Sequence, residues 1–306
     1  MIAFIRRWFT VTRMPFSSVA VVPFVLGGFL AFRGGHAVAW SSVLIGAFCV
    51  LLITMACHLI GEVFDAQGDL LTLETGRTPF SGGTLLVANK EVRPSTALIV
   101  AGTFLVVAVL LGALITLPTR NWTLLCLGGI GVLSAILYST PPIRLAYRGL
   151  GEILIAFCYG WLTLVTGYAT ATGRFEPLAL QLVGLPLMCT IFNVIFLNEY
   201  PDYQPDKYVG KKNLVVRFGP ATGTWIYGTV NFGTAVSVFL LWMVYRPHQP
   251  LYLLAVIPAI ALSLWLAYRV TIKGDWTEIK TITPLCGLGI ALNHLCSVTI
   301  AIIAYT

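Results

Sequence analysis

The stretch SSVLIGAFCVLLITMACHLIGEVFDAQGD, which covers Ser41–Asp69, decides the fold class. Its residues 43–60 include no Asp, Glu, Lys or Arg. A helix of about 20 apolar residues is long enough to cross a hydrocarbon core of about 30 Å. The stretch then becomes acidic, at Glu62, Asp65 and Asp69. It therefore predicts a transmembrane helix with a group of carboxylates at one of its ends.

The remainder of the chain has the same apolar character. Of its 306 residues, 58% are hydrophobic and 10% are charged, whereas soluble domains have about 25% charged residues. Backbone groups in lipid need internal hydrogen bonds, so we expect helices, and the ten-residue alternation of a membrane barrel is absent. We predict an all-α integral membrane protein that forms one domain over 1–306. Its nine predicted spans are 15–33, 38–61, 95–117, 122–139, 149–172, 177–198, 223–245, 250–270 and 282–305.

The distribution of basic residues indicates the orientation. Of the 19 Lys and Arg residues, fifteen precede the first span or lie in loops on that side, and four lie on the opposite side. Cytoplasmic loops of membrane proteins have an excess of Lys and Arg. We therefore expect a cytoplasmic N-terminus and an external C-terminus in a multi-pass protein of a bacterial inner membrane.

A short acidic pattern occurs twice. GEVFDAQGD (Gly61–Asp69) and NEYPDYQPD (Asn198–Asp206) share Glu, Asp, Gln and Asp at equivalent positions, and together they contain half of the 12 acidic residues. The two windows start 137 residues apart, and each follows an apolar run. This spacing suggests two related four-helix halves, at 15–139 and 149–270, followed by a last helix at 282–305.

The pattern is suited to binding a cation and a phosphate. Aspartates four residues apart lie on one face of a helix, and Mg²⁺ typically takes one or two carboxylates together with phosphate oxygens. Basic residues follow each pattern, at Arg77 after the first and at Lys207 and Lys211 after the second. Carboxylates, Mg²⁺ and basic side chains around one pocket describe a site for a diphosphate with an apolar tail.

These segments resemble the UbiA superfamily of intramembrane prenyltransferases, whose members have nine transmembrane helices around a central cavity and aspartate-rich motifs on cytoplasmic loops. The most specific segment is NEYPDYQPDKYVGKKNLVVRFG (Asn198–Gly219), which looks like the second motif of the branch that prenylates 1,4-dihydroxy-2-naphthoate in menaquinone biosynthesis. YSTPPIRLAYRGLGE (Tyr138–Glu152) and RTPFSGG (Arg77–Gly83) look like two further segments of that branch, and RMP (Arg13–Pro15) is similar to its entry to the first helix.

The resemblance implies roles for individual residues. It implies that Mg²⁺, as two ions, is held by Asp65, Asp69, Asn198, Asp202 and Asp206. It implies that the diphosphate is bound by Arg13, Arg77, Arg144, Lys207 and Lys211, and that catalysis involves the four aspartates and Tyr138. The implied reaction transfers a prenyl group from a polyprenyl diphosphate to an aromatic acceptor, a quinone precursor such as 1,4-dihydroxy-2-naphthoate, and releases diphosphate.

One position departs from the family pattern. The first motif of the family begins with Asn four residues before its first Asp, and Gly61 occupies that position here. Glu62 or His58 could supply a replacement ligand. The departure keeps a second reaction open, that of a UbiA-type terpene cyclase, in which the prenyl cation attacks its own double bonds without an acceptor. A transporter is disfavoured because the ionisable residues cluster at one membrane face rather than in the middle of the helices.

Overall fold

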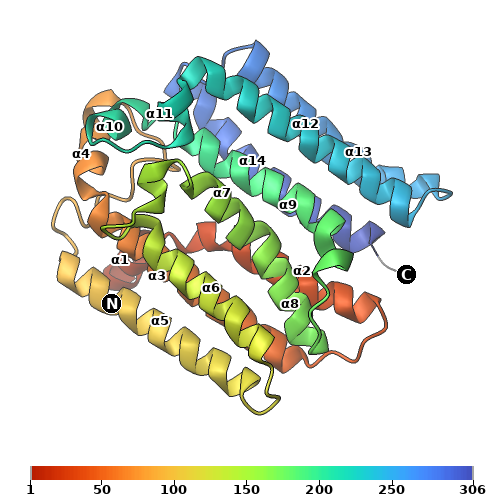
Figure 1. Ribbon diagram of the computed structural model, residues 1–306. Helices are drawn as coiled ribbons and strands as arrows, with labels where there is room; N and C mark the ends of the chain where they lie inside the picture. Colours follow the sequence, from red (N-terminus) through yellow and green to blue (C-terminus); the bar gives the residue numbers. More distant parts are fainter. Residues whose placement is uncertain (1, 305–306) are drawn as a thin grey trace.

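The computed structural model describes residues 2–304, and all regular structure in that range is helical (Figure 1). Nine helical segments in it are long and apolar enough to cross a membrane. The elements are α1 (Ile2–Val11), η1 (Met14–Ser17), α2 (Ser18–Arg33), α3 (Trp40–Phe64), α4 (Ala66–Thr75), α5 (Pro94–Thr116), α6 (Trp122–Ser139), η2 (Leu145–Arg148), α7 (Gly151–Ile155), η3 (Ala156–Leu162), α8 (Thr163–Thr172), α9 (Pro177–Asn198), α10 (Tyr203–Tyr208), α11 (Leu214–Phe218), α12 (Pro220–Tyr245), η4 (Pro250–Tyr252), α13 (Leu253–Ala267), η5 (Tyr268–Ile272) and α14 (Ile279–Ile303).

The nine predicted spans are confirmed, and their ends differ from the observed ends by at most three residues. The predicted span 149–172 is built from three consecutive pieces, α7, η3 and α8, of which η3 is a wider, π-type turn. Apolar composition determines which segments enter the membrane, but it does not distinguish a π turn from an α-helix.

The helices α2 and α8 cross at very close range. A Cβ atom on Gly27 would overlap the carbonyl oxygen of Leu164, and a Cβ atom on Gly167 would overlap the carbonyl oxygen of Phe24. Small residues allow membrane helices to approach closely, so that dispersion contacts hold them together. This crossing joins the first membrane span to α8, and it places Phe24 and Leu164 in the largest apolar core.

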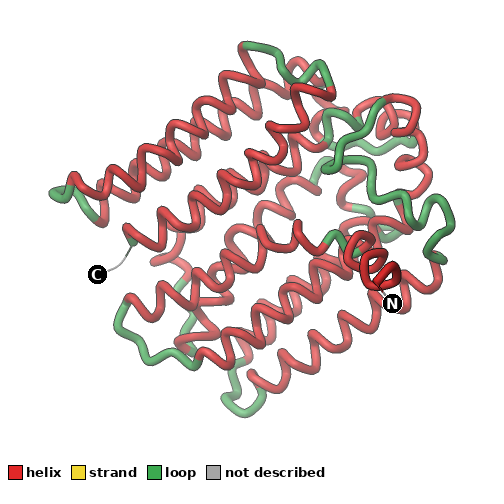
Figure 2. The backbone as a smooth tube through the Cα atoms, turned by 180° about the vertical axis from the view of Figure 1, so that it is seen from behind, coloured by secondary structure: helices red, strands yellow, loops and turns green. Residues whose placement is uncertain are grey.

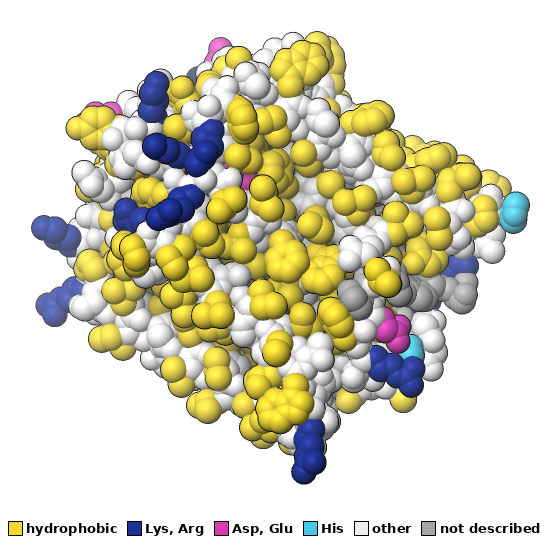
Figure 3. Space-filling model, viewed as in Figure 1, with side chains coloured by type: hydrophobic (Ala, Val, Ile, Leu, Met, Phe, Trp, Pro, Cys, Tyr) yellow, Lys and Arg dark blue, Asp and Glu magenta, His cyan; other side chains and the backbone are white. Residues whose placement is uncertain are grey.

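The helices α5 and α6 are among the least buried of the nine spans. In the apolar stretch that crosses the membrane, only 17% of α5 and 22% of α6 are buried inside the molecule. Large apolar side chains such as Leu110 and Leu114 are more than 60% exposed, which in a membrane protein is the surface that contacts lipid. Figure 3 shows hydrophobic side chains over the middle of the visible face, whereas Lys and Arg gather near α10 and α11.

The short helices gather at one end of the bundle. In Figure 1, α4, α10 and α11 lie together at this end, and the reverse view in Figure 2 places α1 and several long loops there as well. The helices α4 and α10 pack against each other. Because each of them begins at one of the two acidic patterns, this packing brings the patterns together.

Candidate active site

The two aspartate pairs have the same local structure. Helix α3 ends at Phe64, and the amide of Asp69 in the first turn of α4 donates to the carbonyl of Asp65 at 3.0 Å. The amide of Asp206 in the first turn of α10 donates to the carbonyl of Asp202 at 2.8 Å. Each pair therefore has the helical spacing that the sequence predicts, but it lies on a separate short helix rather than at the end of the spanning helix.

The loop between α4 and α5 connects the two aspartate pairs. The amide of Gly82 donates to Asp202 Oδ2 at 2.9 Å. Gly83 packs against the carboxylate of Asp69, and a Cβ atom there would lie 2.7 Å from the carboxyl carbon. Since Asp69 belongs to the first pattern and Asp202 to the second, the turn formed by two consecutive glycines contacts both carboxylates.

Three more side chains hold this loop in place. The amide of Thr84 donates to one oxygen of Glu62 at 2.6 Å, and the Thr84 hydroxyl donates to the other at 2.7 Å. Arg13 Nη2 donates to the carbonyl of Phe80 at 2.8 Å, and the Arg77 guanidinium donates to the carbonyl of Gly83. Glu62 therefore has both oxygens engaged in positioning the loop.

A cavity lies beneath this loop. Its polar end is formed by carboxylates together with the two basic residues Arg13 and Lys211, and its other end is formed by apolar side chains such as Ile155 and Ile191. Two buried oxygens, Asn198 Oδ1 and Asp202 Oδ1, have no hydrogen-bond partner. Buried polar atoms in proteins almost always have a hydrogen-bond partner, so these two free oxygens indicate that a ligand binds here.

Burial and mutual repulsion dominate the electrostatics of the carboxylates. Burial, followed by the charge of neighbouring Asp65, raises the pKa of Asp69 to about 8. Burial raises the pKa of Asp206 to about 7, although Lys211 opposes this shift from 3.3 Å. Burial also raises the pKa of Asp202. Carboxyl groups that retain protons near neutral pH are short of positive charge, and a divalent cation would supply it.

Lys211 is the basic residue at the centre of this group. Burial alone would lower the pKa of its ammonium, but the charges of Asp206 and Asp65 outweigh burial and raise that pKa well above the ordinary value. Lys211 therefore keeps its positive charge inside the cavity, where a second anion could bind to it.

The donor set fits Mg²⁺ with phosphate as a co-ligand. Within residues 2–304, no group of three His, Cys, Asp or Glu side chains converges closely enough to hold a metal on its own. Mg²⁺ usually keeps one or two carboxylates and fills its octahedron with water and phosphate oxygens. The unpartnered oxygens of Asn198 and Asp202 and the carboxyl groups of Asp65 and Asp69 all line the same cavity, which is the arrangement that such mixed coordination requires.

A model of the UbiA prenyltransferase family matches residues 20–281. The chain belongs to this family. The chain is 25% identical over 261 residues to a 2-carboxy-1,4-naphthoquinone phytyltransferase of Synechocystis sp., a match that covers 83% of this chain and 80% of that protein. It is 26% identical over 172 residues to a 1,4-dihydroxy-2-naphthoate octaprenyltransferase of Bacillus subtilis, a match that covers 56% of this chain and 53% of the relative. The protein is thus a membrane-bound prenyltransferase of the UbiA family.

The fold also agrees with solved UbiA structures. A UbiA homolog from Archaeoglobus fulgidus, bound to DMAPP and Mg²⁺, superposes with a TM-score of 0.63 at 19% identity, over 96% of this chain and 99% of that one. The all-helical architecture with nine spans is therefore the UbiA fold.

The structure brings most of the predicted site residues of this UbiA protein to one place. The cavity is lined by Arg13, Asp65, Asp69, Tyr138, Asn198, Asp202 and Lys211. The other four predicted residues do not line it. Asp206 pairs with Lys211, Arg144 Nη2 donates to the carbonyl of Phe64 at 3.2 Å, Lys207 lies near the ring of Tyr203, and Arg77 holds Gly83.

Several polar contacts of the site were not predicted from the sequence. The Tyr147 hydroxyl donates to Asp65 Oδ1 at 3.0 Å, and Asn213 Nδ2 donates to Asp206 Oδ2 at 2.8 Å. Both residues lie in the two segments that carry the family resemblance, but nothing in their spacing indicates these partners. Glu199 lines the cavity with one buried oxygen unpartnered, and burial raises its pKa well above the ordinary value.

Gly61 lies on the wall of the cavity. A Cβ atom there would have only Ser139 Oγ at 3.8 Å and Asp65 Oδ2 at 4.0 Å as neighbours, so an asparagine would have room to enter. Of its two candidate replacements, Glu62 binds Thr84, and His58 Nδ1 lies 2.9 Å from the carbonyl oxygen of Thr12. Both also line the cavity.

Proposed function

We propose that this protein transfers the prenyl group of a polyprenyl diphosphate to a hydroxylated naphthoate, such as 1,4-dihydroxy-2-naphthoate, and releases diphosphate in a Mg²⁺-dependent reaction. The observation that supports this most directly is a single cavity with Asp65 and Asp69 of the first pair, Asp202 of the second pair and two basic residues at one end and apolar walls at the other. The names of the Synechocystis and Bacillus relatives support a naphthalene-type acceptor. The structure of the Archaeoglobus homolog supports Mg²⁺ and an allylic diphosphate.

The diphosphate binds at the polar end in this proposal. Bound Mg²⁺, as two ions, would neutralise the diphosphate and make it a better leaving group. Asp65, Asp69, Asn198 and Asp202 would hold the metal. Lys211 would donate to a diphosphate oxygen, because its ammonium is buried in the cavity wall and stays charged. Preorganised donors of this kind act on charge that develops as the C–O bond breaks.

The reacting carbon lies between the diphosphate and the apolar end. Tyr138 and Tyr159 line this part of the cavity, and aromatic faces stabilise a nearby cation. The allylic C–O bond breaks, and diphosphate leaves with its electron pair. The allylic carbon then forms a new C–C bond to an electron-rich ring carbon of the acceptor, and that ring carbon loses a proton, or its carboxylate as CO2, to restore the aromatic ring. Exclusion of water by the apolar walls protects the cation until the acceptor reacts with it.

In the membrane, we propose that the end with α4, α10 and α11 faces the cytoplasm. The excess of Lys and Arg on the loops of this side supports the orientation. The N-terminus then lies on the cytoplasmic side and the C-terminus on the other side of a bacterial inner membrane. The whole chain serves as one domain, with two related halves at 15–139 and 149–270 and a last helix at 282–305.

The test uses purified protein in detergent with Mg²⁺ and geranylgeranyl diphosphate, in the presence and absence of 1,4-dihydroxy-2-naphthoate, with products identified by mass spectrometry. We expect a prenylated naphthalene product only when the acceptor is present. A cyclic hydrocarbon or alcohol formed without acceptor would identify a terpene cyclase instead. Unreacted diphosphate in all samples would contradict both reactions for this prenyl donor.

A further inference from the structure

Three basic residues form a cluster outside the catalytic cavity. Arg148 is the last residue of η2, Lys212 lies in the loop before α11, and Arg217 belongs to α11. All three are exposed, and none of them lines the cavity that contains the aspartates. Figure 3 shows Lys and Arg gathered over this part of the surface, near α10 and α11.

Backbone carbonyls hold the basic cluster together. The Arg217 guanidinium donates from Nε to the carbonyl of Lys212 at 2.8 Å and from Nη2 to the carbonyl of Arg148 at 2.6 Å. The Arg148 guanidinium donates in the same way, from Nε to the carbonyl of Ile143 and from Nη2 to the carbonyl of Pro142 at 3.0 Å. Both guanidinium groups are therefore fixed in place, and within residues 2–304 the Nη1 atom of each is left for a further partner.

No acidic side chain balances the positive charge of the basic cluster. The ion pairs of the described chain, residues 2–304, involve other basic residues, namely Arg7, Lys211, Arg269 and Lys273. Like charges at short range repel each other, so the cluster favours a bound anion. A phosphate group can accept two parallel hydrogen bonds from a guanidinium. Because both guanidinium groups are already oriented, such binding immobilises little additional side chain.

The basic cluster lies at a boundary of the membrane. Arg148 precedes the span Gly151–Thr172 by three residues, and Arg217 precedes the span Pro220–Tyr245 by three residues. Lipid headgroups lie just outside the hydrocarbon core that the apolar spans cross. Basic pockets between transmembrane helices on the cytoplasmic side bind anionic headgroups. The starts of two spans thus bring one arginine each to the level of the lipid phosphates.

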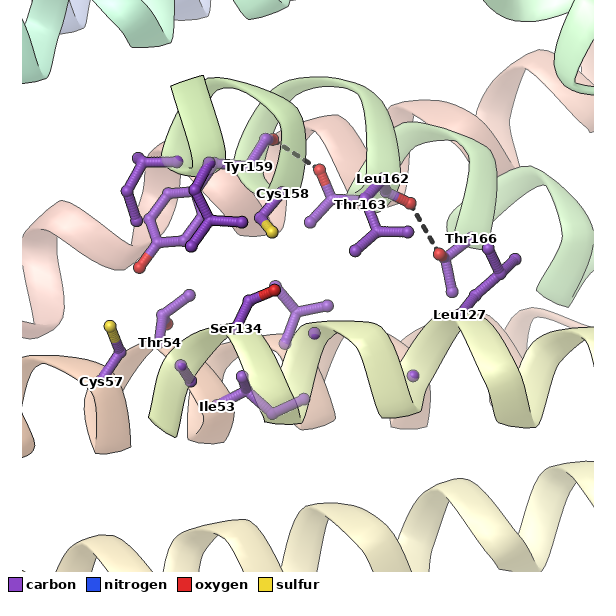
Figure 4. A pocket seen from close by; sticks show the side chains of 16 residues that line it. Ile53, Thr54, Cys57, Leu127, Ser134, Cys158, Tyr159, Leu162, Thr163 and Thr166 are labelled. Atoms are coloured by element: carbon purple, nitrogen blue, oxygen red, sulfur yellow. Dashed lines mark hydrogen bonds between the residues drawn. The ribbon is translucent and has the colours of Figure 1, made fainter. Parts of the chain in front are cut away.

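An apolar, lipid-facing stripe begins next to the basic cluster. Leu150 and Ile153 are 49% and 55% exposed, and side chains three residues apart lie on one face of a helix. Another face of the same span, with Cys158 and Leu162, lines an apolar cavity toward α3 and α6 (Figure 4). Phe218 of α11 is 54% exposed as well. A ligand with an anionic end at the arginines can therefore extend an apolar chain along the outer surface of the protein.

We propose that the basic cluster binds the headgroup of one anionic phospholipid of the cytoplasmic leaflet, and that the acyl chains of this lipid lie along Leu150 and Ile153. Three positive charges without acidic partners select a headgroup with net negative charge, such as phosphatidylglycerol. They disfavour phosphatidylcholine, because its ammonium group would be repelled. The apolar stripe selects a lipid over a soluble phosphate, because only a lipid covers it. The site is separate from the proposed reaction, since it requires neither a prenyl diphosphate nor an acceptor.

The test uses native mass spectrometry of the purified protein, which counts bound lipids as the mole fraction of phosphatidylglycerol in the detergent micelles is raised. Phosphatidylcholine with the same acyl chains is titrated in parallel. The variants are Lys212→Gln and the double variant Lys212→Gln/Arg217→Gln. Arg93→Gln is the matched control, because Arg93 is exposed and directly precedes the span Pro94–Thr116. Lys212→Glu replaces the double variant if the loss of Arg217 prevents folding, since Lys212 binds Tyr147 and Arg217 only through its backbone.

In the wild type we expect one molecule of phosphatidylglycerol to bind more tightly than all later ones. Each Lys or Arg near an anionic leaflet contributes about 5-fold in affinity. The Kd of the first lipid should therefore rise by about 5-fold in Lys212→Gln and by about 30-fold in the double variant, whereas Arg93→Gln should stay within about 2-fold of the wild type.

Three results would overturn the proposal. They are equally tight binding of phosphatidylcholine, equal losses in Arg93→Gln and Lys212→Gln, and displacement of the first lipid by millimolar inorganic phosphate, which would assign the cluster to a small anion. A failure of prenyl transfer would refute the proposed function and would leave these lipid affinities unchanged.

Discussion

Gly83→Ala should impair catalysis far more than it impairs folding. Gly83 has a φ angle of +57°, and a left-handed conformation costs an L-residue about 1–2 kcal/mol. The new Cβ atom would also overlap Oδ2 of Asp69 and lie 2.7 Å from its carboxyl carbon, whereas ordinary van der Waals contact begins at 3.4 Å. Because Oδ2 is the nearest atom, the carboxylate has to move by about 1 Å or more. Because a side-chain end can rotate away, this movement adds little to the cost in stability.

The consequence for catalysis follows from the position of Asp69 in the cavity wall. A misplacement of about 1 Å at a reacting centre reduces rates by up to about 10²-fold. We expect kcat/KM to fall by about 10-fold or more at low Mg²⁺, and we expect the Mg²⁺ concentration for half-maximal rate to rise. The assay is a Mg²⁺ titration of prenyl transfer at a fixed diphosphate concentration, together with thermal unfolding of the same samples.

Gly35→Ala is the matched control. Gly35 has a φ angle of +80°, and a Cβ atom there meets no atom within 4 Å. This variant therefore has the same backbone penalty without displacing a carboxylate. Its thermal stability should fall about as much as that of Gly83→Ala, and its Mg²⁺ response should be that of the wild type. Identical Mg²⁺ responses in the two variants would refute the reasoning, because backbone strain alone would then account for both.

Three further predictions concern the metal site. Asp65→Asn and Asp202→Asn should each abolish Mg²⁺-dependent turnover while thermal unfolding stays cooperative. Full activity in both variants would contradict a metal site formed by aspartates of both acidic patterns. Gly61→Asn should lower the Mg²⁺ concentration for half-maximal rate, since the side chain has room beside Asp65, and an unchanged titration would show that Gly61 is already compensated. The pKa of Asp69 is raised to about 8, so below that pH Mg²⁺ must displace a proton in order to bind. The Mg²⁺ affinity measured by calorimetry should therefore increase from pH 6 to pH 8. Equal affinities at the two pH values would contradict a raised pKa of Asp69.

The spans were predictable because hydrophobicity is a local property of the sequence. Each run of about 20 apolar residues produced a helix, as 95–117 did in α5. The spacing of Asp65 and Asp69 was also readable, because a separation of four residues fixes one helical face. Both features can be predicted without knowing which helices pack against each other.

Individual side-chain contacts were not predictable in this way. The sequence predicts that Arg77 binds diphosphate, but it does not indicate that the Arg77 guanidinium also donates to the carbonyl of Gly83. The bond from Tyr147 to Asp65 spans 82 residues, and nothing near either residue indicates the other. The role of the α4–α5 loop as a bridge between the two acidic patterns likewise depends on the packing of α4 on α10.

The crossing of α2 and α8 has the form of an approximate symmetry. Gly27 and Gly167 are 140 positions apart, close to the 137 that separate the acidic patterns, and the same offset of 140 relates Phe24 to Leu164. Gly27 contacts Leu164 while Gly167 contacts Phe24, so each helix presents a glycine and a large apolar residue three positions before it to the other helix. Reciprocal contacts of this kind are what a two-fold axis produces between two subunits. Here both partners of the contact belong to one polypeptide, so no second chain is needed to form it.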